Sequence, residues 1–424
     1  MRTCVAALLL SALLFLAGCD TPAQTYWSPD GTLAAYIPSS GGPLRLFDQN
    51  GKIIVTFGET IGGVAWSADS KRLYLAQQMD RSTRVPVVER SMRARNADPD
   101  TLATTTRPSN ADGSQMVVGY WENSAFVPLF STGSWFVTHM ALSPDQTWLA
   151  FACINPNGKD DEKNHSLLQA YSIKSRRLYL LAFGANPEAF AFSGPRRLAY
   201  AEPLNVVHGQ ISPLGQIVET ELDDAAGEFA RDELLGIATD RTPWMAAIGE
   251  DLLFTANPIA LPILRADVEK ERPKLYRYSR ADKSLKVLVS DVGPFFAPSP
   301  DGKLILLEYT GKLPNGENAD DLAVADAAAG QLHSLAPAKV SALDDQNNKT
   351  SGIAAFAAWR SSDQISFLSP LGADKPAGRK DNLARFDLGL YQLTADFQLK
   401  PIRPLSTDWP LEAKPFLKFA QGGQ

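Results

Sequence analysis

A short pattern recurs along this sequence and constrains its fold more than any other feature. The clearest copy is Trp27-Ser28-Pro29-Asp30-Gly31, followed by the apolar run Leu33 to Tyr36. Proline presets φ for a turn, aspartate bonds to nearby backbone, and glycine accepts a positive φ. Each copy therefore predicts a tight hairpin that joins two antiparallel strands.

Seven copies of this pattern are present, some of them degraded. The six later copies begin at Trp66, Leu142, Phe192, Ala247, Pro298 and Trp359. In most copies a second pair of apolar runs follows the hairpin. Four strands per repeat is the content of a β-propeller blade.

Successive copies begin 39 to 76 residues apart, whereas a minimal blade takes roughly 40 to 50 residues. The excess predicts insertions within blades. No long stretch has apolar residues at helical spacing. The sequence therefore predicts an all-β chain: a single β-propeller of seven four-stranded blades over residues 26–405, followed by a C-terminal tail of residues 406–424. Six or eight blades remain open alternatives.

The Trp-Ser-Pro-Asp-Gly turns resemble the WD-like Pro-Asp repeats of the TolB-like propeller family of bacterial envelope proteins. The resemblance spans about residues 25 to 405. It implies the propeller fold and an envelope setting. It says little about molecular function, because the repeated residues form turns and core.

Residues 1–18 have the pattern of a secretory signal peptide, with Arg2 ahead of the apolar stretch Val5 to Leu16. That stretch is short for a membrane span. Leu16-Ala17-Gly18-Cys19 resembles the lipobox of bacterial lipoproteins, which implies cleavage before Cys19 and acylation of its thiol, palmitate included. The alternative is an ordinary secretory signal with an incidental cysteine.

Residues 19–25 then form a lipidated N-terminus and a short tether, so we expect the propeller to lie close to the bilayer on the periplasmic side. Three acyl chains are expected to anchor stably, whereas one binds only marginally. Asp20 resembles an inner-membrane retention signal, which favours the inner over the outer membrane.

Charge and cysteine content exclude some classes. The chain has 41 Lys and Arg against 47 Asp and Glu, a net charge of −6, so nucleic acid is not an expected partner. Once the signal peptide with Cys4 is removed and Cys19 is acylated, Cys153 has no partner for a disulfide. It lies in the apolar run Leu149 to Ile154, which predicts a buried, inert thiol.

The long insertions fall between the second and third strand of a blade, so we expect them on the face opposite the Pro-Asp turns. They span Met79 to Ser114, Asn155 to His165, Asn257 to Pro273, Gly311 to Asp320 and Pro370 to Asp381. Long loops on a rigid scaffold commonly carry binding. The alternative is neutral, tolerated expansion of the surface.

Two of these insertions supply the candidate partner-binding residues. The longest holds an arginine-rich segment interrupted by Val85-Pro86-Val87-Val88, suited to an acidic partner or to anionic headgroups. A solvated loop is the alternative. The second is apolar and contains prolines. The candidates are Arg81, Arg84, Arg90, Arg93, Arg95, Ile259, Leu261 and Ile263.

Patterns that would indicate catalysis are missing from the sequence. There is no Gly-x-Ser-x-Gly, Cys-x-x-Cys or His-Glu-x-x-His. The four histidines lie in different blades, and we expect surface or capping roles for them, with His139 best placed to reach the channel. We expect no enzyme activity, no metal and no cofactor. Oxygen-rich loops at 155–162 and 315–321 leave a structural Ca²⁺ as an open alternative.

The sequence thus predicts a lipid-anchored periplasmic propeller that acts as a non-catalytic protein-binding or scaffolding module. Its expected partners are envelope proteins, together with the membrane through the lipid. The alternatives are an enzyme acting on polysaccharide or cell wall, or a small-ligand sensor, each using the central channel.

Overall fold

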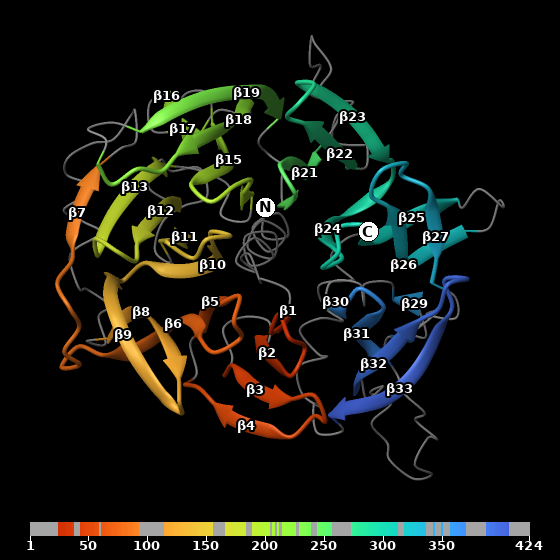
Figure 1. Ribbon diagram of the computed structural model, residues 1–424, viewed down its shortest axis with the longest axis horizontal. Coiled ribbons are helices and arrows are strands. Elements are labelled where there is room, and N and C mark those ends of the chain that lie inside the picture. Colours follow the sequence, from red (N-terminus) through yellow and green to blue (C-terminus); the bar gives the residue numbers. More distant parts are fainter. Residues whose placement is uncertain are drawn as a thin grey trace, which may run out of the picture.

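The computed structural model shows a ring of seven blades around a central axis (Figure 1). Every regular element among the described residues is a strand. The described residues are 24–37, 43–58, 61–92, 114–155, 166–183, 189–203, 206–207, 210–211, 214–225, 229–238, 244–256, 273–312, 318–335, 342–343, 349–350, 357–369 and 387–406.

Each blade contains four antiparallel strands that follow one another outward from the axis, and blade 3 has a fifth strand at its outer edge. The innermost strands of blades 1 to 7 are β1 (Gln24–Trp27), β5 (Ile61–Trp66), β10 (Phe136–Leu142), β14 (Phe190–Phe192), β20 (Met245–Ile248), β24 (Val292–Pro298) and β30 (Ala358–Ser361). The second strands are β2 (Leu33–Ile37), β6 (Leu73–Asp80), β11 (Trp148–Ile154), β15 (Arg197–Pro203), β21 (Asp251–Ala256), β25 (Leu304–Lys312) and β31 (Gln364–Ser369).

The outer half of each blade completes the sheet. The third strands are β3 (Arg45–Asp48), β8 (Ser114–Glu122), β12 (Ser166–Ser172), β18 (Leu214–Glu221), β22 (Lys274–Ser279), β26 (Asn318–Asp326) and β32 (Asp387–Leu393). The outermost are β4 (Ile53–Thr56), β9 (Ala125–Gly133), β13 (Arg177–Phe183), β19 (Ala230–Ala238), β23 (Ser284–Val289), β27 (Leu332–Ser334) and β33 (Leu399–Ser406).

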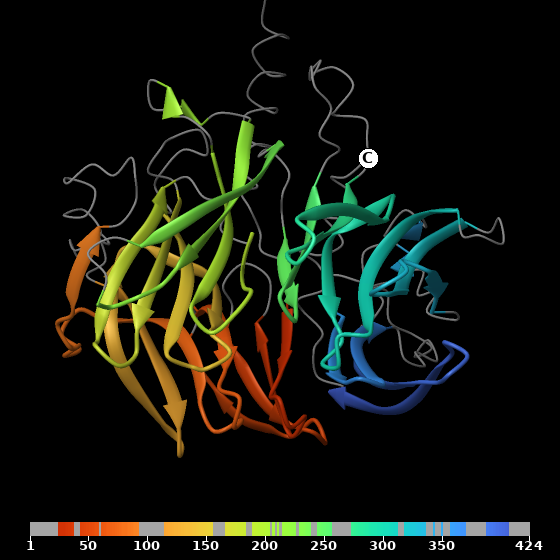
Figure 2. The same ribbon diagram turned by 45° about the horizontal axis from the view of Figure 1, so that its top comes forward.

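The predicted fold class and the predicted count of seven four-stranded blades are confirmed. The order of the strands also places all five predicted insertions between the second and third strand of a blade. Two-stranded hairpins lie outside the blades: β16 (Val206–Val207) with β17 (Gln210–Ile211), and β28 (Ala342–Leu343) with β29 (Lys349–Thr350). The first of these stands above the ring in Figure 2.

The Pro-Asp turns form as the repeat predicts. In the first copy the Ser28 hydroxyl donates to Asp30 Oδ1 at 2.6 Å and accepts from the Leu33 amide at 3.0 Å. Asp30 Oδ1 also accepts from the Thr32 amide at 3.0 Å, and Gly31 has φ +67°. The same serine–aspartate bond recurs in the turns that begin at Ser67, Ser143, Ser299 and Ser361. One hydrogen-bonded loop is thus repeated around the ring.

Blade 4 departs from this pattern, because its repeat reads Phe192-Ser193-Gly194-Pro195 and has no aspartate. The Ser193 hydroxyl instead donates to the carboxylate of Glu219, on the third strand β18 of the same blade. Glu219 is buried and forms an ion pair at 2.6 Å with Arg280 of blade 5. A carboxylate from elsewhere in the fold therefore takes the place of the missing aspartate.

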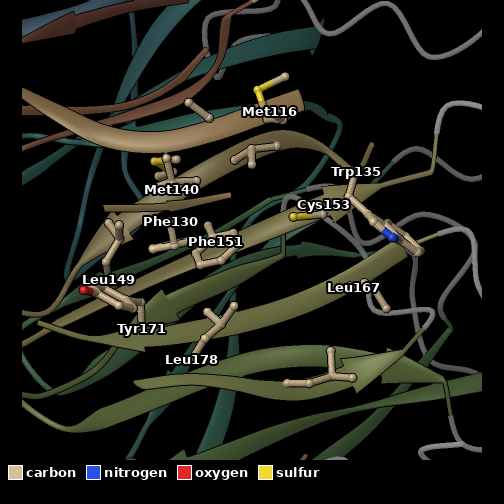
Figure 3. Close-up of a cluster of buried hydrophobic side chains, with 14 of the residues drawn as sticks. Met116, Phe130, Trp135, Met140, Leu149, Phe151, Cys153, Leu167, Tyr171 and Leu178 are labelled. Atoms are coloured by element: carbon tan, nitrogen blue, oxygen red, sulfur yellow. The ribbon is translucent and has the colours of Figure 1, made fainter. Parts of the chain in front are cut away.

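The core lies between adjacent blades. Figure 3 shows the cluster between blades 2 and 3, where Phe130 of β9 packs against Phe151 and Tyr171 with ring centroids 5.4 and 4.7 Å apart. Cys153 is fully buried in this cluster. Burial raises the pKa of its thiol, which keeps it protonated. The expectation of a buried thiol at this position is confirmed.

The tryptophans of the repeat join neighbouring blades. Trp66 of blade 2 donates its indole N–H to the Tyr26 carbonyl of blade 1 at 3.0 Å. Trp359 of blade 7 donates to the Ala297 carbonyl of blade 6 at 2.8 Å. Trp27 of blade 1 donates to Ser366 Oγ of blade 7 at 2.8 Å. These equivalent positions therefore pack between blades, as their recurrence in the repeat predicts.

Blades 1 and 7 close the ring without sharing a strand, because each is built from one continuous stretch of chain. Besides the Trp27–Ser366 bond, the Arg360 guanidinium donates to the Gly31 carbonyl at 2.9 Å and to Gln49 at 2.7 Å. Its guanidinium carbon also lies 5.4 Å from the centre of the Trp27 ring. Side-chain contacts thus hold the seam together.

Candidate functional site

Two regions of the described structure combine exposed or cavity-lining side chains with rigid support: the outer edge of blade 3 and the central channel. Several of the predicted binding and modification residues lie outside the described residues. They are Cys19, Arg93, Arg95, Ile259, Leu261 and Ile263.

The longest insertion contributes a fifth strand to the neighbouring blade. Strand β7 (Glu89–Met92) pairs in parallel with β13, with Glu89 opposite Arg177 and Met92 opposite Leu180. It forms the outer edge of blade 3, visible as the orange strand at the left of Figure 1. The Arg177 guanidinium reinforces this pairing with an ion pair to Glu89 at 2.9 Å.

This pairing changes where the longest insertion runs. The insertion leaves the end of β6 on the face opposite the Pro-Asp turns. Because β13 starts at the Pro-Asp face, its parallel partner β7 must start there too. Residues 81–88 therefore run down the outer rim of the disc. The expectation that every insertion lies on one face is wrong for this part of the chain.

The predicted arginines of this insertion play different roles. Arg90 lies on β7 and donates to the Ser131 carbonyl of β9 at 2.6 Å, so it ties β7 to blade 2. Burial lowers the pKa of its guanidinium. Arg81 and Arg84 are exposed. Val87 is 100% exposed. We call Arg81, Arg84 and Val87 the rim ridge.

The rim ridge is held at both ends. At its start, the Ser82 amide donates to Asp80 Oδ1 at 2.7 Å, and the Gln115 side chain donates to the Thr83 carbonyl at 3.1 Å. At its end, Val88 packs on the core between blades 2 and 3 and β7 begins at Glu89. The backbone that carries the exposed side chains is therefore anchored rather than freely solvated.

The second region is a pocket of about 420 Å³ in the central channel. Innermost strands of blades 1, 2, 3, 6 and 7 line it, together with Trp244 just before β20 of blade 5. Pro29 and Pro300, from two Pro-Asp turns, also line it, so the pocket lies toward the Pro-Asp end of the channel. Its wall includes six aromatic side chains: Tyr26, Trp27, Trp66, Trp244, Phe296 and Trp359.

Glu308 is the carboxylate in this wall. It lies on β25, opposite an irregularity in β24, where the register passes from Val292–Tyr309 directly to Phe296–Leu307. A Cβ on Gly293 would lie 2.4 Å from Glu308 Oε2, so the carboxylate occupies the space that the glycine leaves open. Burial raises the pKa of Glu308.

His139 lies within β10 and packs between the rings of Phe190 and Trp244, with centroids 5.0 and 5.2 Å away. Burial lowers its pKa to about 4, so it is neutral at pH 7. The expected surface or capping role is therefore wrong for His139, because neighbouring blades bring aromatic rings onto it. His333 stacks on Phe397 with centroids 3.7 Å apart. His165 and His208 lie outside the described residues. In chain order His165 stands between β11 and β12, so it belongs to blade 3 with His139, and the prediction of four different blades is wrong.

Sequence reasoning did not single out Glu308 or Glu219. Each lies in an ordinary-looking strand, and its setting depends on a partner strand far away in sequence. Among the residues that the structure describes, no three His, Cys, Asp or Glu side chains come close enough together to hold a metal ion. In the same part of the chain, no helix is long and apolar enough to cross a membrane.

The fold and its pocket define a single seven-bladed β-propeller. No family model matches the chain, and no curated protein matches it significantly. The chain does resemble solved structures. Acylaminoacyl peptidase from Pyrococcus horikoshii has a TM-score of 0.52 at 11% identity, over 94% of this chain and 53% of that one. This chain thus spans about half the length of that peptidase.

The β-propeller domain of the Trilobed protease from Pyrococcus furiosus has a TM-score of 0.50 at 11% identity, over 92% of this chain and 99% of that domain. That domain is noted for an open velcro topology, and blades 1 and 7 here likewise share no strand. A puromycin hydrolase matches with a TM-score of 0.50 at 12% identity, over 94% of this chain and 55% of that one. At such identities the likeness shows the fold alone.

Proposed function

We propose that this propeller is a non-catalytic binding module of the bacterial cell envelope, and that it holds an envelope protein against the outer edge of blade 3. The observation that carries the proposal is the rim ridge, where Arg81, Arg84 and Val87 are exposed on anchored backbone. Because this backbone is already ordered, binding through it costs little backbone entropy.

The chemistry of the ridge favours an acidic partner with an apolar contact. Two arginines can each form paired hydrogen bonds to carboxylates, and Val87 offers an apolar contact between blade 3 and the partner. Arg90 is excluded from this surface, because its guanidinium is directed to the Ser131 carbonyl. Arg93 and Arg95 remain candidates by sequence alone.

A lipid on Cys19 is the second part of the proposal, and it rests on the sequence Leu16-Ala17-Gly18-Cys19. The first strand begins at Gln24, so four residues separate it from the cysteine. At no more than about 3.6 Å per residue, this tether holds the propeller against the membrane surface. Labelling cells with a palmitate analogue tests this part: wild type is labelled and Cys19→Ala is not, and Cys19→Ala leaves the membrane fraction.

Cross-linking in intact envelopes, followed by affinity capture and mass spectrometry, tests the binding surface. The test variant is Arg81→Glu/Arg84→Glu/Val87→Asp. The control is Lys52→Glu/Lys71→Glu, which makes similar charge reversals at exposed lysines near the Pro-Asp turns. We expect one envelope protein to be captured by wild type and control and to be lost from the ridge variant.

Two results would overturn this assignment. One is equal capture by the ridge variant. The other is a ridge variant that keeps its captured proteins and loses affinity only for vesicles of anionic lipid, which would make the ridge a headgroup contact. Urea midpoints measured on all three proteins separate loss of binding from loss of folding.

A further inference from the structure

The channel pocket has a chemical character distinct from that of the rim ridge. Its volume of about 420 Å³ lies within the range of sites that enclose small molecules. Six aromatic side chains from five blades and one carboxylate line it. Because it lies within the channel, toward the Pro-Asp turns, it is separate from the rim ridge.

The aromatic wall is fixed and offers few hydrogen-bond donors. The indole N–H of Trp66 is bonded to the Tyr26 carbonyl, and that of Trp359 to the Ala297 carbonyl. These two indole N–H groups are therefore not free to bond a ligand in the pocket. The faces of tryptophan rings attract cations electrostatically.

Glu308 supplies negative charge within this wall. Among the described residues, no hydrogen-bond donor or cation is paired with its carboxylate, which fills the space beside Gly293 that a Cβ would take. Glu308 is half-buried, and a partly desolvated charge without a counter-charge costs free energy. A cationic ligand in the pocket would supply that counter-charge.

We propose that the channel pocket binds a compact organic cation, such as an alkylated ammonium, with aromatic rings around the cation and the Glu308 carboxylate as its counter-ion. An inorganic divalent cation fits less well, because Ca²⁺ takes six to eight oxygen ligands and the described wall supplies one carboxylate. An anion would meet Glu308 and no opposing positive charge in the described wall.

Two probes of nearly the same shape test whether the positive charge of the ligand is needed for binding. Choline carries a quaternary ammonium, and 3,3-dimethyl-1-butanol has nearly the same shape without the charge. Binding is followed by tryptophan fluorescence, since Trp66, Trp244 and Trp359 line the pocket, and by titration calorimetry. We expect choline, or the bulkier tetraethylammonium, to bind saturably and about tenfold more tightly than the neutral isostere.

Variants locate the site. Glu308→Gln keeps the shape of the side chain and removes its charge, and we expect it to weaken cation binding about tenfold. Gly293→Ala displaces the carboxylate by contact and is expected to weaken binding in the same direction. Glu250→Gln, at an exposed carboxylate on the turn between β20 and β21, is the control and is expected to leave binding unchanged.

Equal affinity for choline and its neutral isostere would overturn the proposal, as would cation binding that survives in Glu308→Gln. So would the absence of saturable binding by choline and tetraethylammonium across the millimolar range. The capture experiment at the rim ridge is independent of all three outcomes, so either proposal can fail without the other.

Discussion

Replacement of Gly51 by alanine tests how the ring is closed. Gly51 lies in the turn between β3 and β4 of blade 1 and has φ +83°. A Cβ at this position would lie 1.6 Å from the Leu405 carbonyl oxygen, on the outermost strand of blade 7. The substitution therefore has two effects: it strains the turn, and it pushes blade 1 away from blade 7.

The two contributions can be separated with a second glycine. Gly249, between β20 and β21, has φ +60°, and a Cβ added there would meet nothing within 4 Å. Gly249→Ala therefore carries only the backbone strain of about 1 to 2 kcal/mol. Gly51→Ala adds the displacement of a neighbouring backbone, about 1 to 3 kcal/mol more by analogy with overpacked cores. We expect the larger loss of unfolding free energy at Gly51.

Urea unfolding followed by tryptophan fluorescence compares both variants with wild type. The midpoints can be compared directly where the slope m of the unfolding free energy against urea concentration is unchanged. Gly330→Ala provides a comparison at another boundary between blades. A Cβ on Gly330 of blade 6 would lie 2.3 Å from the Leu288 carbonyl oxygen of blade 5. If Gly330→Ala is severe and Gly51→Ala is as mild as Gly249→Ala, blades 1 and 7 are not packed as closely as other blades, and the argument for a tight seam fails.

Four further outcomes are expected. Gln146→Gly raises the unfolding free energy by about 0.5 to 1 kcal/mol in urea titrations, because Gln146 has φ +59° in a Pro-Asp turn. Hydrogen bonds from Ser299 and Ser361 lower the pKa of Asp301 and Asp363. The stability that these carboxylates confer is therefore complete above about pH 4 and is lost as pH falls through the lowered pKa. Urea midpoints measured between pH 5 and 2 should accordingly fall less steeply for Asp301→Asn than for wild type. Cys153 resists iodoacetamide in folded protein and reacts in urea, as peptide mass spectrometry would show. The raised pKa of Glu308 means that its charged form is less stable in the folded protein than in the unfolded chain. Glu308→Gln is therefore expected to raise the urea midpoint at pH 7, and this gain should disappear toward pH 4, where the glutamate is protonated.

The fold was predictable because its signal is local. A serine, a proline, an aspartate and a glycine within five residues specify a turn whose bonds all close within that turn, as the Ser28–Asp30 bond shows. Repetition of the turn then gives the number of blades. Even the degraded copy at Ser193 keeps its place in the count, although the carboxylate that completes its turn comes from Glu219, which no local pattern indicates.

The site residues were less predictable because their roles depend on contacts between distant segments. Arg90 lies in an arginine-rich stretch that is typical of a solvated loop, and its role follows from the pairing of β7 with β13, 88 residues away. His139 is neutral because Phe190 and Trp244 from the next two blades enclose it. Arg81 and Arg84, which make no such long-range contact in the described structure, are the exposed residues that the sequence predicts.

The topology also bears on which kind of partner the rim ridge meets. Strand β1 runs toward a Pro-Asp turn, so it begins on the opposite face of the disc, where a lipid on Cys19 would attach within four residues. That face would then lie toward the bilayer, and the Pro-Asp end of the channel would open away from it. The rim ridge, which runs between the two faces, would point sideways. In this orientation Arg81, next to the end of β6, lies near the face toward the bilayer, whereas Arg84 and Val87, farther along the ridge, face a protein standing beside the propeller, which is why we favour an envelope protein as the partner.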